Sequence, residues 1–275
     1  MDESNIGLDP VETTHSMGDE LAKTARVAVF ATCMVDIAGH SVLKATEDVL
    51  EAIGVEAVLP EGQSCCGQPA LNSGYPGPAV KLAKHWIRTF EPYDVVVSPA
   101  GSCVAMVHHH FPRILQGGWR ERAIEISRRT FELTQFLVAR RDRLELLLSE
   151  TVTYHDSCHM KRFLGESSAP REVLSWIKGL QLVEMEGADT CCGFGGTFSV
   201  KFPEVSVEMG RLKLDLASRT KARFIISSDP GCLMHLEGVA RAQGSSLRAM
   251  HIAELLALAM QTEDSYSHRL LSAEQ

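Results

Sequence analysis

Three things that the sequence lacks set the first limits on its function. Positive charge is in deficit: 27 Lys and Arg residues stand against 35 Asp and Glu, for a net charge of −8. Nucleic-acid binders draw most of their affinity from Lys and Arg contacts with phosphates, so no nucleic-acid partner is expected. Long apolar runs are also missing: a stretch such as 95–97 is short, whereas a membrane-spanning helix needs about 20 residues. No membrane span is therefore expected.

An export signal is the third missing feature. Residues 1–24 carry six acidic side chains and no apolar segment of the kind that signal peptides contain. We interpret them as a disordered acidic tail. The protein is then expected in the cytoplasm, where thiols stay reduced. Its eight cysteines are accordingly expected to bind metal or carry out redox chemistry rather than form disulfides.

The cysteines are arranged as two copies of one pattern. The first four follow C-x31-CC-x36-C and the last four follow C-x32-CC-x39-C. The flanks match as well, because VAVFATC ends at the first cysteine of one set and VTYHDSC at that of the other. Such self-similarity indicates that one unit has been duplicated. The two sets are Cys33, Cys65, Cys66 and Cys103, and Cys158, Cys191, Cys192 and Cys232.

Each half repeats one order of predicted elements. A strand leads to the first cysteine, a second strand to the vicinal pair and, after a long helix, a third strand to the last cysteine. The predicted strands are 27–31, 55–60 and 93–99, and 152–155, 180–185 and 222–228. This alternation predicts an α/β fold with mostly parallel sheets flanked by helices. We predict a first domain at 25–148, which ends in a helical connector, and a second domain at 149–275.

Functional groups of such folds collect at the carboxyl ends of the strands, so the four thiols of each half are expected to meet. They could be buried structural cysteines, ligands of a structural zinc or ligands of an iron–sulfur cluster. A cluster is favoured, because neighbouring cysteines can bind different irons of it. The glycine after each vicinal pair, Gly67 or Gly193, would bring backbone N–H groups close to the sulfurs. Zinc stays possible in one half.

Longer motifs carry a resemblance to a known family. FATCMVD, CCGQPALNSGY, SPAGSC, CCGFGGTFSVK and MHIAELL resemble the CCG-domain (cysteine-rich domain) family. That family includes the cysteine-rich subunit of heterodisulfide reductase and the iron–sulfur subunits of glycolate oxidase and of anaerobic glycerol-3-phosphate dehydrogenase. The resemblance is closest to the lactate utilisation protein A branch of the family, and it extends from Arg26 to about Met260.

The resemblance implies two tandem duplicated CCG domains. The eight cysteines would bind iron–sulfur clusters of the 4Fe-4S type, one in each half. The resemblance further implies an oxidoreductase subunit that transfers electrons within a complex oxidising L-lactate to pyruvate. Two further lactate-utilisation subunits, one of them a ferredoxin-like iron–sulfur protein, would complete that complex.

The chain departs from the family pattern once in each half. Where the broader family has C-x-x-C, this sequence has CVAM and CLMH, so Met106 and His235 stand in place of a fifth cysteine. His235 is therefore a possible additional ligand, since imidazole ligates some clusters. His155 and His159, near Cys158, are expected to donate hydrogen bonds to sulfur instead.

Two alternative functions stay open at this point. One is a heterodisulfide-reductase-like thiol/disulfide oxidoreductase subunit. The missing fifth cysteine, which supports disulfide chemistry in those relatives, disfavours it. The other is a zinc-stabilised scaffold of an oxidoreductase complex. No catalytic residue is identified from the sequence.

Overall fold

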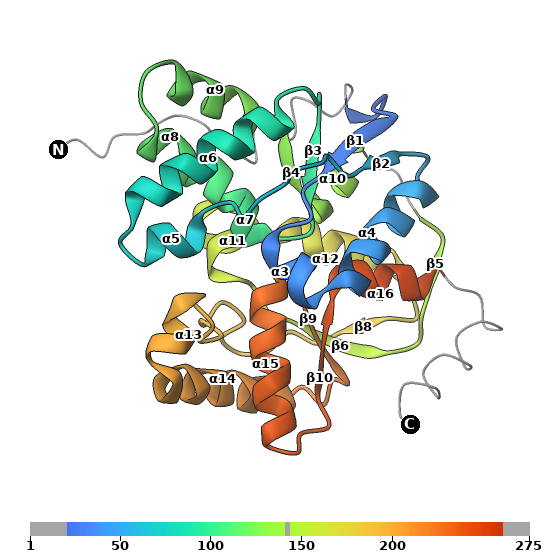
Figure 1. Cartoon of the computed structure of the whole chain (residues 1–275). Helices are drawn as coiled ribbons and strands as arrows, with labels where there is room; N and C mark the ends of the chain where they lie inside the picture. The colour runs from blue at the N-terminus through green and yellow to red at the C-terminus, as the bar shows by residue number, and fades with distance from the viewer. Residues whose placement is uncertain (1–20, 141–143, 261–275) are drawn as a thin grey trace.

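A computed structural model of the chain describes residues 21–140 and 144–260 (Figure 1). Residues 1–20 of the predicted acidic tail, and 261–275 of the predicted second domain, lie outside these ranges. Among the helices in the two described ranges, none is both long and apolar enough to cross a bilayer.

Two four-stranded parallel sheets have the same strand order. The first runs β2-β1-β3-β4 and the second β8-β6-β9-β10, with parallel pairing throughout. The first contains β1 (Arg26–Val29), β2 (Glu56–Val58), β3 (Val96–Ser98) and β4 (Thr130–Glu132); the second contains β6 (Thr151–Tyr154), β8 (Gln181–Leu182), β9 (Phe224–Ser227) and β10 (Arg248–His251). Short strands β5 (Leu146–Leu147) and β7 (Ile177–Lys178) pair separately. The repeated order confirms the predicted α/β fold with parallel sheets.

Helices connect the strands in both halves. Those of the first half are α3 (Cys33–Ala38), α4 (His40–Ala52), α5 (Gln68–Asn72), α6 (Pro76–Phe90), α7 (Gly101–Ala105), the π-helical segment η1 (Met106–His110), α8 (Phe111–Ile114), α9 (Gly118–Ser127) and α10 (Leu133–Arg140). Those of the second half are α11 (Cys158–Phe163), α12 (Ser168–Ser175), α13 (Thr197–Lys201), α14 (Pro203–Ser218), α15 (Pro230–Ala242) and α16 (Ile252–Ala259). The connector predicted to be helical is interrupted, because β4 lies between α9 and α10 and adds a fourth strand to the first sheet.

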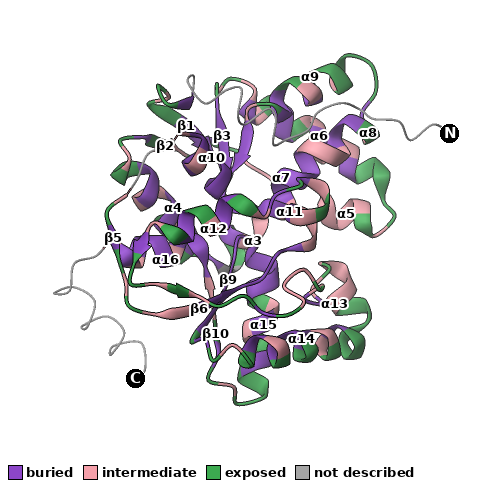
Figure 2. Ribbon diagram, turned by 180° about the vertical axis from the view of Figure 1, so that it is seen from behind, coloured by how far each residue is buried: buried purple, intermediate pink, exposed green. Residues whose placement is uncertain are grey.

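One central hydrophobic core is shared by both sheets. Val29 of β1 and Tyr154 of β6 belong to the same buried cluster, together with residues of α4, α10, α12 and α16. The opposite face of each sheet has a core of its own. Helices α6, α8 and α9 cover the first sheet on that side, and α14 and α15 cover the second. Figure 2 shows the buried strands flanked by helices that carry buried as well as half-buried and exposed residues. Layers of this kind are how α/β domains bury both faces of a parallel sheet.

A buried carboxyl group at the end of β4 gives the fold a pH dependence. Glu132 is fully buried and accepts hydrogen bonds from the amide (2.7 Å) and the hydroxyl of Thr134. Its other carboxylate oxygen has no partner within the described ranges. Burial raises the pKa of Glu132 from 4.5 to about 7. The folded chain therefore holds this proton more tightly than the unfolded chain does, and stability falls as the pH rises from about 4.5 to 7.

We expect Glu132→Gln to flatten this decline, because the amide has no proton to lose in that range. One pKa unit corresponds to about 1.4 kcal/mol. The wild type should therefore lose on the order of 3 kcal/mol of unfolding free energy over this pH range, and the variant should not. Urea unfolding at pH 5 and pH 8 measures it. Glu51→Gln, at an exposed position on α4, is the control and should keep the wild-type slope. A Glu132→Gln variant with that same slope would contradict the assignment.

Candidate metal site

The fold brings every cysteine to the carboxyl ends of the strands. Cys33 and Cys158 begin the helices that follow β1 and β6, and Cys103 and Cys232 lie in the first turns of the helices after β3 and β9. The two vicinal pairs lie in the loops that follow β2 and β8. Parallel strands end at one edge of a sheet, so residues far apart in sequence meet there.

In the first half the thiols form two close pairs. Cys33 Sγ lies 3.5 Å from Cys65 Sγ, and Cys66 Sγ lies 3.5 Å from Cys103 Sγ. The Gly67 amide donates a hydrogen bond of 3.4 Å to Cys65 Sγ. Interaction with Cys33, and then with Cys66, lowers the pKa of Cys65, whereas the pKa of Cys33 is raised by its contact with Cys65. One thiolate is thus stabilised within the group, and the thiolate is the form that binds metal.

The second half repeats this arrangement. The Gly193 amide donates a hydrogen bond of 3.5 Å to Cys191 Sγ. Interaction with Cys158, and then with Cys192, lowers the pKa of Cys191, while the pKa of Cys158 is raised by the same contact. Cys192 is buried, as is Cys232. The first thiol of each vicinal pair is therefore the one held most readily as thiolate.

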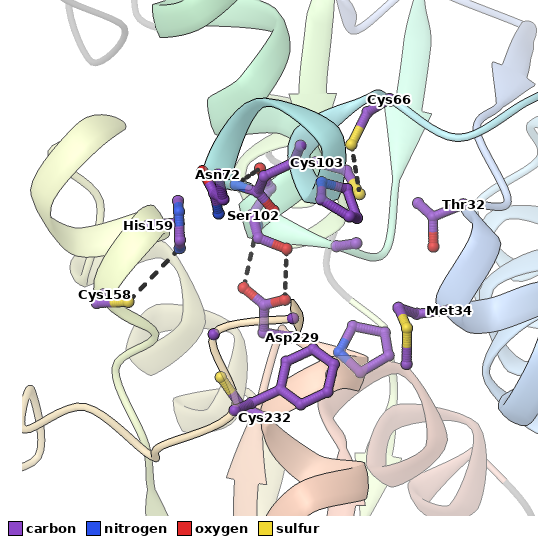
Figure 3. Close-up of a pocket in the computed structure, with 18 of the residues that line it drawn as sticks. Thr32, Met34, Cys66, Asn72, Ser102, Cys103, Cys158, His159, Asp229 and Cys232 are labelled. Carbon is purple, nitrogen blue, oxygen red and sulfur yellow. Dashed lines mark hydrogen bonds between the residues drawn. The ribbon is translucent and has the colours of Figure 1, made fainter. Parts of the chain in front are cut away.

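Both sets of cysteines face a single cavity of about 110 Å³ (Figure 3). One water molecule needs roughly 10–15 Å³ on this measure, so the space accepts a much larger group. Seven cysteines line the cavity: Cys33, Cys66, Cys103, Cys158, Cys191, Cys192 and Cys232. The eighth, Cys65, contacts Cys33. The arrangement can hold thiophilic metal at two places that open onto one space.

Glycine is required after each vicinal pair. Gly193 has φ +95°, and a Cβ there would lie 2.4 Å from the Ser206 carbonyl oxygen and 2.9 Å from Met209 Cβ. Gly67 has φ +89° and meets the Ala79 carbonyl oxygen at 3.3 Å. Both loops thus press against the long helix of their own half, α14 or α6. A side chain at Gly193 would force the loop away from α14, whereas at Gly67 the positive φ is the main obstacle to any other residue.

A hydrogen-bonded bridge crosses the cavity between the halves. The backbone amide and the hydroxyl of Ser102 donate to the two carboxylate oxygens of Asp229, at 3.0 and 2.6 Å (Figure 3). The Gly101 amide donates to the Ser228 carbonyl at 3.1 Å. Both contacts stand beside the last cysteine of a half. Nothing in the repeat pattern indicates this bridge, since Ser102 and Asp229 occupy different positions in the two repeats.

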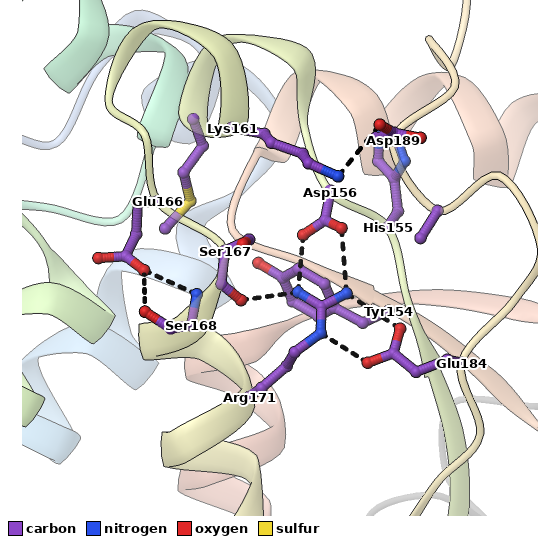
Figure 4. Close-up of polar contacts among 12 residues, drawn as sticks. Tyr154, His155, Asp156, Lys161, Glu166, Ser167, Ser168, Arg171, Glu184 and Asp189 are labelled. Atoms are coloured by element: carbon purple, nitrogen blue, oxygen red, sulfur yellow. Dashed lines mark hydrogen bonds and ion pairs between the residues drawn. The ribbon is translucent and has the colours of Figure 1, made fainter.

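An ion-pair network supports the end of β6 (Figure 4). Arg171 donates to both carboxylate oxygens of Asp156, at 2.8 and 3.0 Å, and to both of Glu184, at 2.6 and 2.9 Å. Asp156 is only 5% exposed, and it stands two residues before Cys158. A buried carboxylate without its partner is costly, so Arg171 fixes the backbone that leads into this cysteine.

The three histidines near the second set of thiols have different surroundings. His235 Nε2 lies 3.1 Å from the Ser206 carbonyl and does not line the cavity. His159 does line it, with Nδ1 3.5 Å from Cys158 Sγ. His155 does not line the cavity either, but it is fully buried, and one of its ring nitrogens lies within 4.8 Å of the sulfurs of both Cys192 and Cys232. Of the three, His155 rather than the predicted candidate His235 is grouped with potential metal ligands.

Comparisons with known proteins agree with the repeated architecture. The cysteine-rich domain family, CCG, matches residues 27–108 and 152–237. Lactate utilization protein A of Geobacillus sp. (strain WCH70) is 45% identical over 235 residues, covering 84% of this chain and 98% of that protein. The protein of the same name from Oceanobacillus iheyensis is 43% identical over 235 residues, covering 84% and 96%.

One solved structure shares the fold. A hypothetical protein from Helicobacter pylori superimposes with a TM-score of 0.63 at 11% identity, covering 94% of this chain and 56% of that one. At so low a sequence identity, the similarity concerns the fold alone.

Proposed function

The chain belongs to the cysteine-rich CCG domain family, and from this membership we propose that it serves lactate utilisation as an iron–sulfur electron-transfer subunit of a complex that oxidises L-lactate to pyruvate. The observation that carries the proposal is the convergence of two duplicated sets of thiols on one cavity. The name of the relatives supports the link to lactate. The facing sets of thiols support the transfer of electrons.

The residues present fit a thiophilic group. Thiolates are soft ligands that favour iron–sulfur clusters, zinc and copper(I) over harder cations. Among the described residues, one acidic side chain, that of Asp229, lines the cavity, and it already accepts two hydrogen bonds from Ser102. One set of ligands would be Cys33, Cys65, Cys66 and Cys103, and the other Cys158, Cys191, Cys192 and Cys232. When bound, an iron–sulfur cluster accepts and releases single electrons.

The chain itself contributes charge balance and exclusion of water. The amides of Gly67 and Gly193 donate to Cys65 and Cys191, and hydrogen bonds to sulfur stabilise its negative charge and tune the potential. Buried cysteines such as Cys66 and Cys192 keep water from the inner side of each site. We assign no residue of this chain to the lactate chemistry. We propose that two further subunits, one ferredoxin-like, complete the complex in the cytoplasm.

A zinc-stabilised scaffold is the second candidate, and one distance favours it. With Zn–S bonds of about 2.3 Å, two thiolates on a tetrahedral zinc lie roughly 3.8 Å apart. The sulfur pairs of the first half, at 3.5 Å, are close to that separation. Zinc in one half is compatible with an electron-carrying cluster in the other.

Metal and sulfide analysis of the anaerobically purified chain tests the proposal. We expect iron and acid-labile sulfide in near-equal amounts, about four of each per 4Fe-4S cluster. We also expect a paramagnetic signal after reduction, measured by electron spin resonance. Zinc in one half would halve the iron and leave the signal. A colourless protein that contains zinc and no sulfide would overturn the electron-transfer function in favour of the scaffold.

A further inference from the structure

The two halves differ at the residue that follows the first strand of each sheet. The repeat places Phe30 and His155 at the same position, three residues before Cys33 and Cys158. Side chains alternate between the faces of a strand. Residue 29, one position earlier in the first half, belongs to the shared central core, whereas Phe30 belongs to the outer core that contains Cys66 and Cys103. His155 is directed in the same way, toward Cys192 and Cys232.

In the first half this position is entirely apolar. Phe30 packs edge-on against Trp86 and Phe90, with ring centroids 5.5 and 5.3 Å apart. Phe30 and Trp86 are both fully buried. A phenyl ring has no nitrogen to offer a metal, so at this point of the site the ligands of the first half are limited to sulfur.

In the second half the partner residue differs as well. The glycine after each vicinal pair packs on equivalent positions of the long helix, Gly67 on Ala79 and Gly193 on Ser206. Trp86 follows Ala79 by the same number of residues as Lys213 follows Ser206, so Trp86 and Lys213 occupy equivalent positions. The Phe–Trp pair is thus replaced by His155 and Lys213, both of them fully buried.

His155 has free nitrogen atoms. Neither ring nitrogen forms a hydrogen bond with any described residue. The nearby Ala188 carbonyl already accepts from the Asp156 amide at 3.0 Å and from Lys213 Nζ at 2.7 Å, which occupies both of its lone pairs. A buried imidazole without a partner is costly and rare.

We propose that His155 is an imidazole ligand of the metal centre in the second half, beside Cys192 and Cys232, so that the two halves hold chemically different centres. The inference rests on the proposed function in that it requires the second half to bind metal. Neutral imidazole joins thiolates in mixed zinc sites and in iron–sulfur centres, where it raises the reduction potential. Lys213, which holds the carbonyls of Gly187 and Ala188 just ahead of the vicinal pair, adds positive charge on the same side.

The test isolates the second half and looks for nitrogen on the metal. Full-length chain carrying Cys66→Ser, which disables the first site, is prepared anaerobically with and without [15N]histidine. X-ray absorption at the iron and zinc edges counts light-atom ligands, and pulsed spin resonance detects nitrogen coupled to a reduced cluster. We expect one nitrogen ligand, with a coupling that shifts on 15N labelling. The mirror variant Cys192→Ser, which keeps only the first site, should show sulfur alone.

His155→Phe then identifies the histidine. Phenylalanine is the residue that the first half already accommodates at this position, and far-UV circular dichroism confirms folding. We expect the nitrogen signal to disappear. His235→Gln and His159→Gln should both retain it. The labelling experiment uses a chain that retains His155, so it remains informative even if His155→Phe fails to fold.

The outcomes separate this inference from the proposed function. A second half that binds metal through sulfur alone, or a nitrogen signal that survives in His155→Phe, overturns the inference and leaves the proposed function standing. A chain that takes up no metal in either half overturns both. Zinc with one nitrogen ligand and no iron supports the ligand role of His155 while overturning electron transfer by this half.

Discussion

We expect Cys192→Ser to empty the second metal site and leave the first one loaded. Cys192 is buried and lies among the apolar residues of the outer core of its half, so a serine hydroxyl there neither ionises near neutral pH nor coordinates soft metal well. Metal per chain should fall by about half if the two halves hold equal amounts. The readout is iron, zinc and sulfide per chain, together with spin resonance of the reduced protein.

The internal repeat supplies the matched control for this experiment. Cys66→Ser should empty the first site and spare the second, and the double variant should bind no metal. All eight cysteines belong to the two proposed sets, so no cysteine elsewhere complicates the count. Loss of metal from both halves in either single variant would show that the two sites do not load independently.

Gly193→Ala is expected to be the most damaging change that leaves every cysteine in place. The new methyl group would lie 2.4 Å from a backbone oxygen of α14, at a residue with φ +95°, and neither problem is relieved by moving a flexible side chain. Steric overlap and a left-handed backbone together cost about 2–5 kcal/mol. The urea midpoint should fall accordingly, and the second site should lose most of its metal, because the vicinal cysteines are displaced.

Gly244→Ala controls for backbone strain alone. Gly244 also has a positive φ, +65°, but a Cβ there meets nothing within 4 Å, and the residue does not line the cavity. It should cost about 1–2 kcal/mol and retain metal. If both alanine variants lost equal stability and kept equal metal, the close approach of Gly193 to α14 would have no role in shaping the site.

The repeat of cysteines predicts the architecture well because each cysteine position follows the end of a strand. A thiol after each of three strands in both halves places the site at the carboxyl edge of the sheet, and the parallel sheets follow that plan, whereas the strand order comes from the structure. The fourth strands escape prediction for a physical reason. Strand β4 is three residues long and runs directly into α10, which leaves no room for an alternating pattern. The strand is defined by its pairing with β3, a contact that the local sequence does not encode.

The histidines show that distance along the sequence is a poor guide to which side chains lie near the thiols. The sequence offers His235 as a possible ligand because it follows Cys232 by three residues, and its Nε2 lies 3.1 Å from the Ser206 carbonyl on α14. His155 lies far from Cys192 and Cys232 in sequence and reaches them because β6 pairs with β9. A signal for it is nevertheless present in the sequence: aligning the repeats sets His155 against Phe30, an exchange of a polar for an apolar residue at a position expected to be buried.

The shared central core changes what the duplication means for the evolution and assembly of the chain. Helix α16, at the end of the second repeat, packs on α4 of the first, and apolar residues of both sheets belong to one cluster. Each repeat therefore completes the interior of the other. If the gene were split at the midpoint, each fragment would expose the apolar face that the other half now covers. The two fragments would then have to associate before either could fold fully.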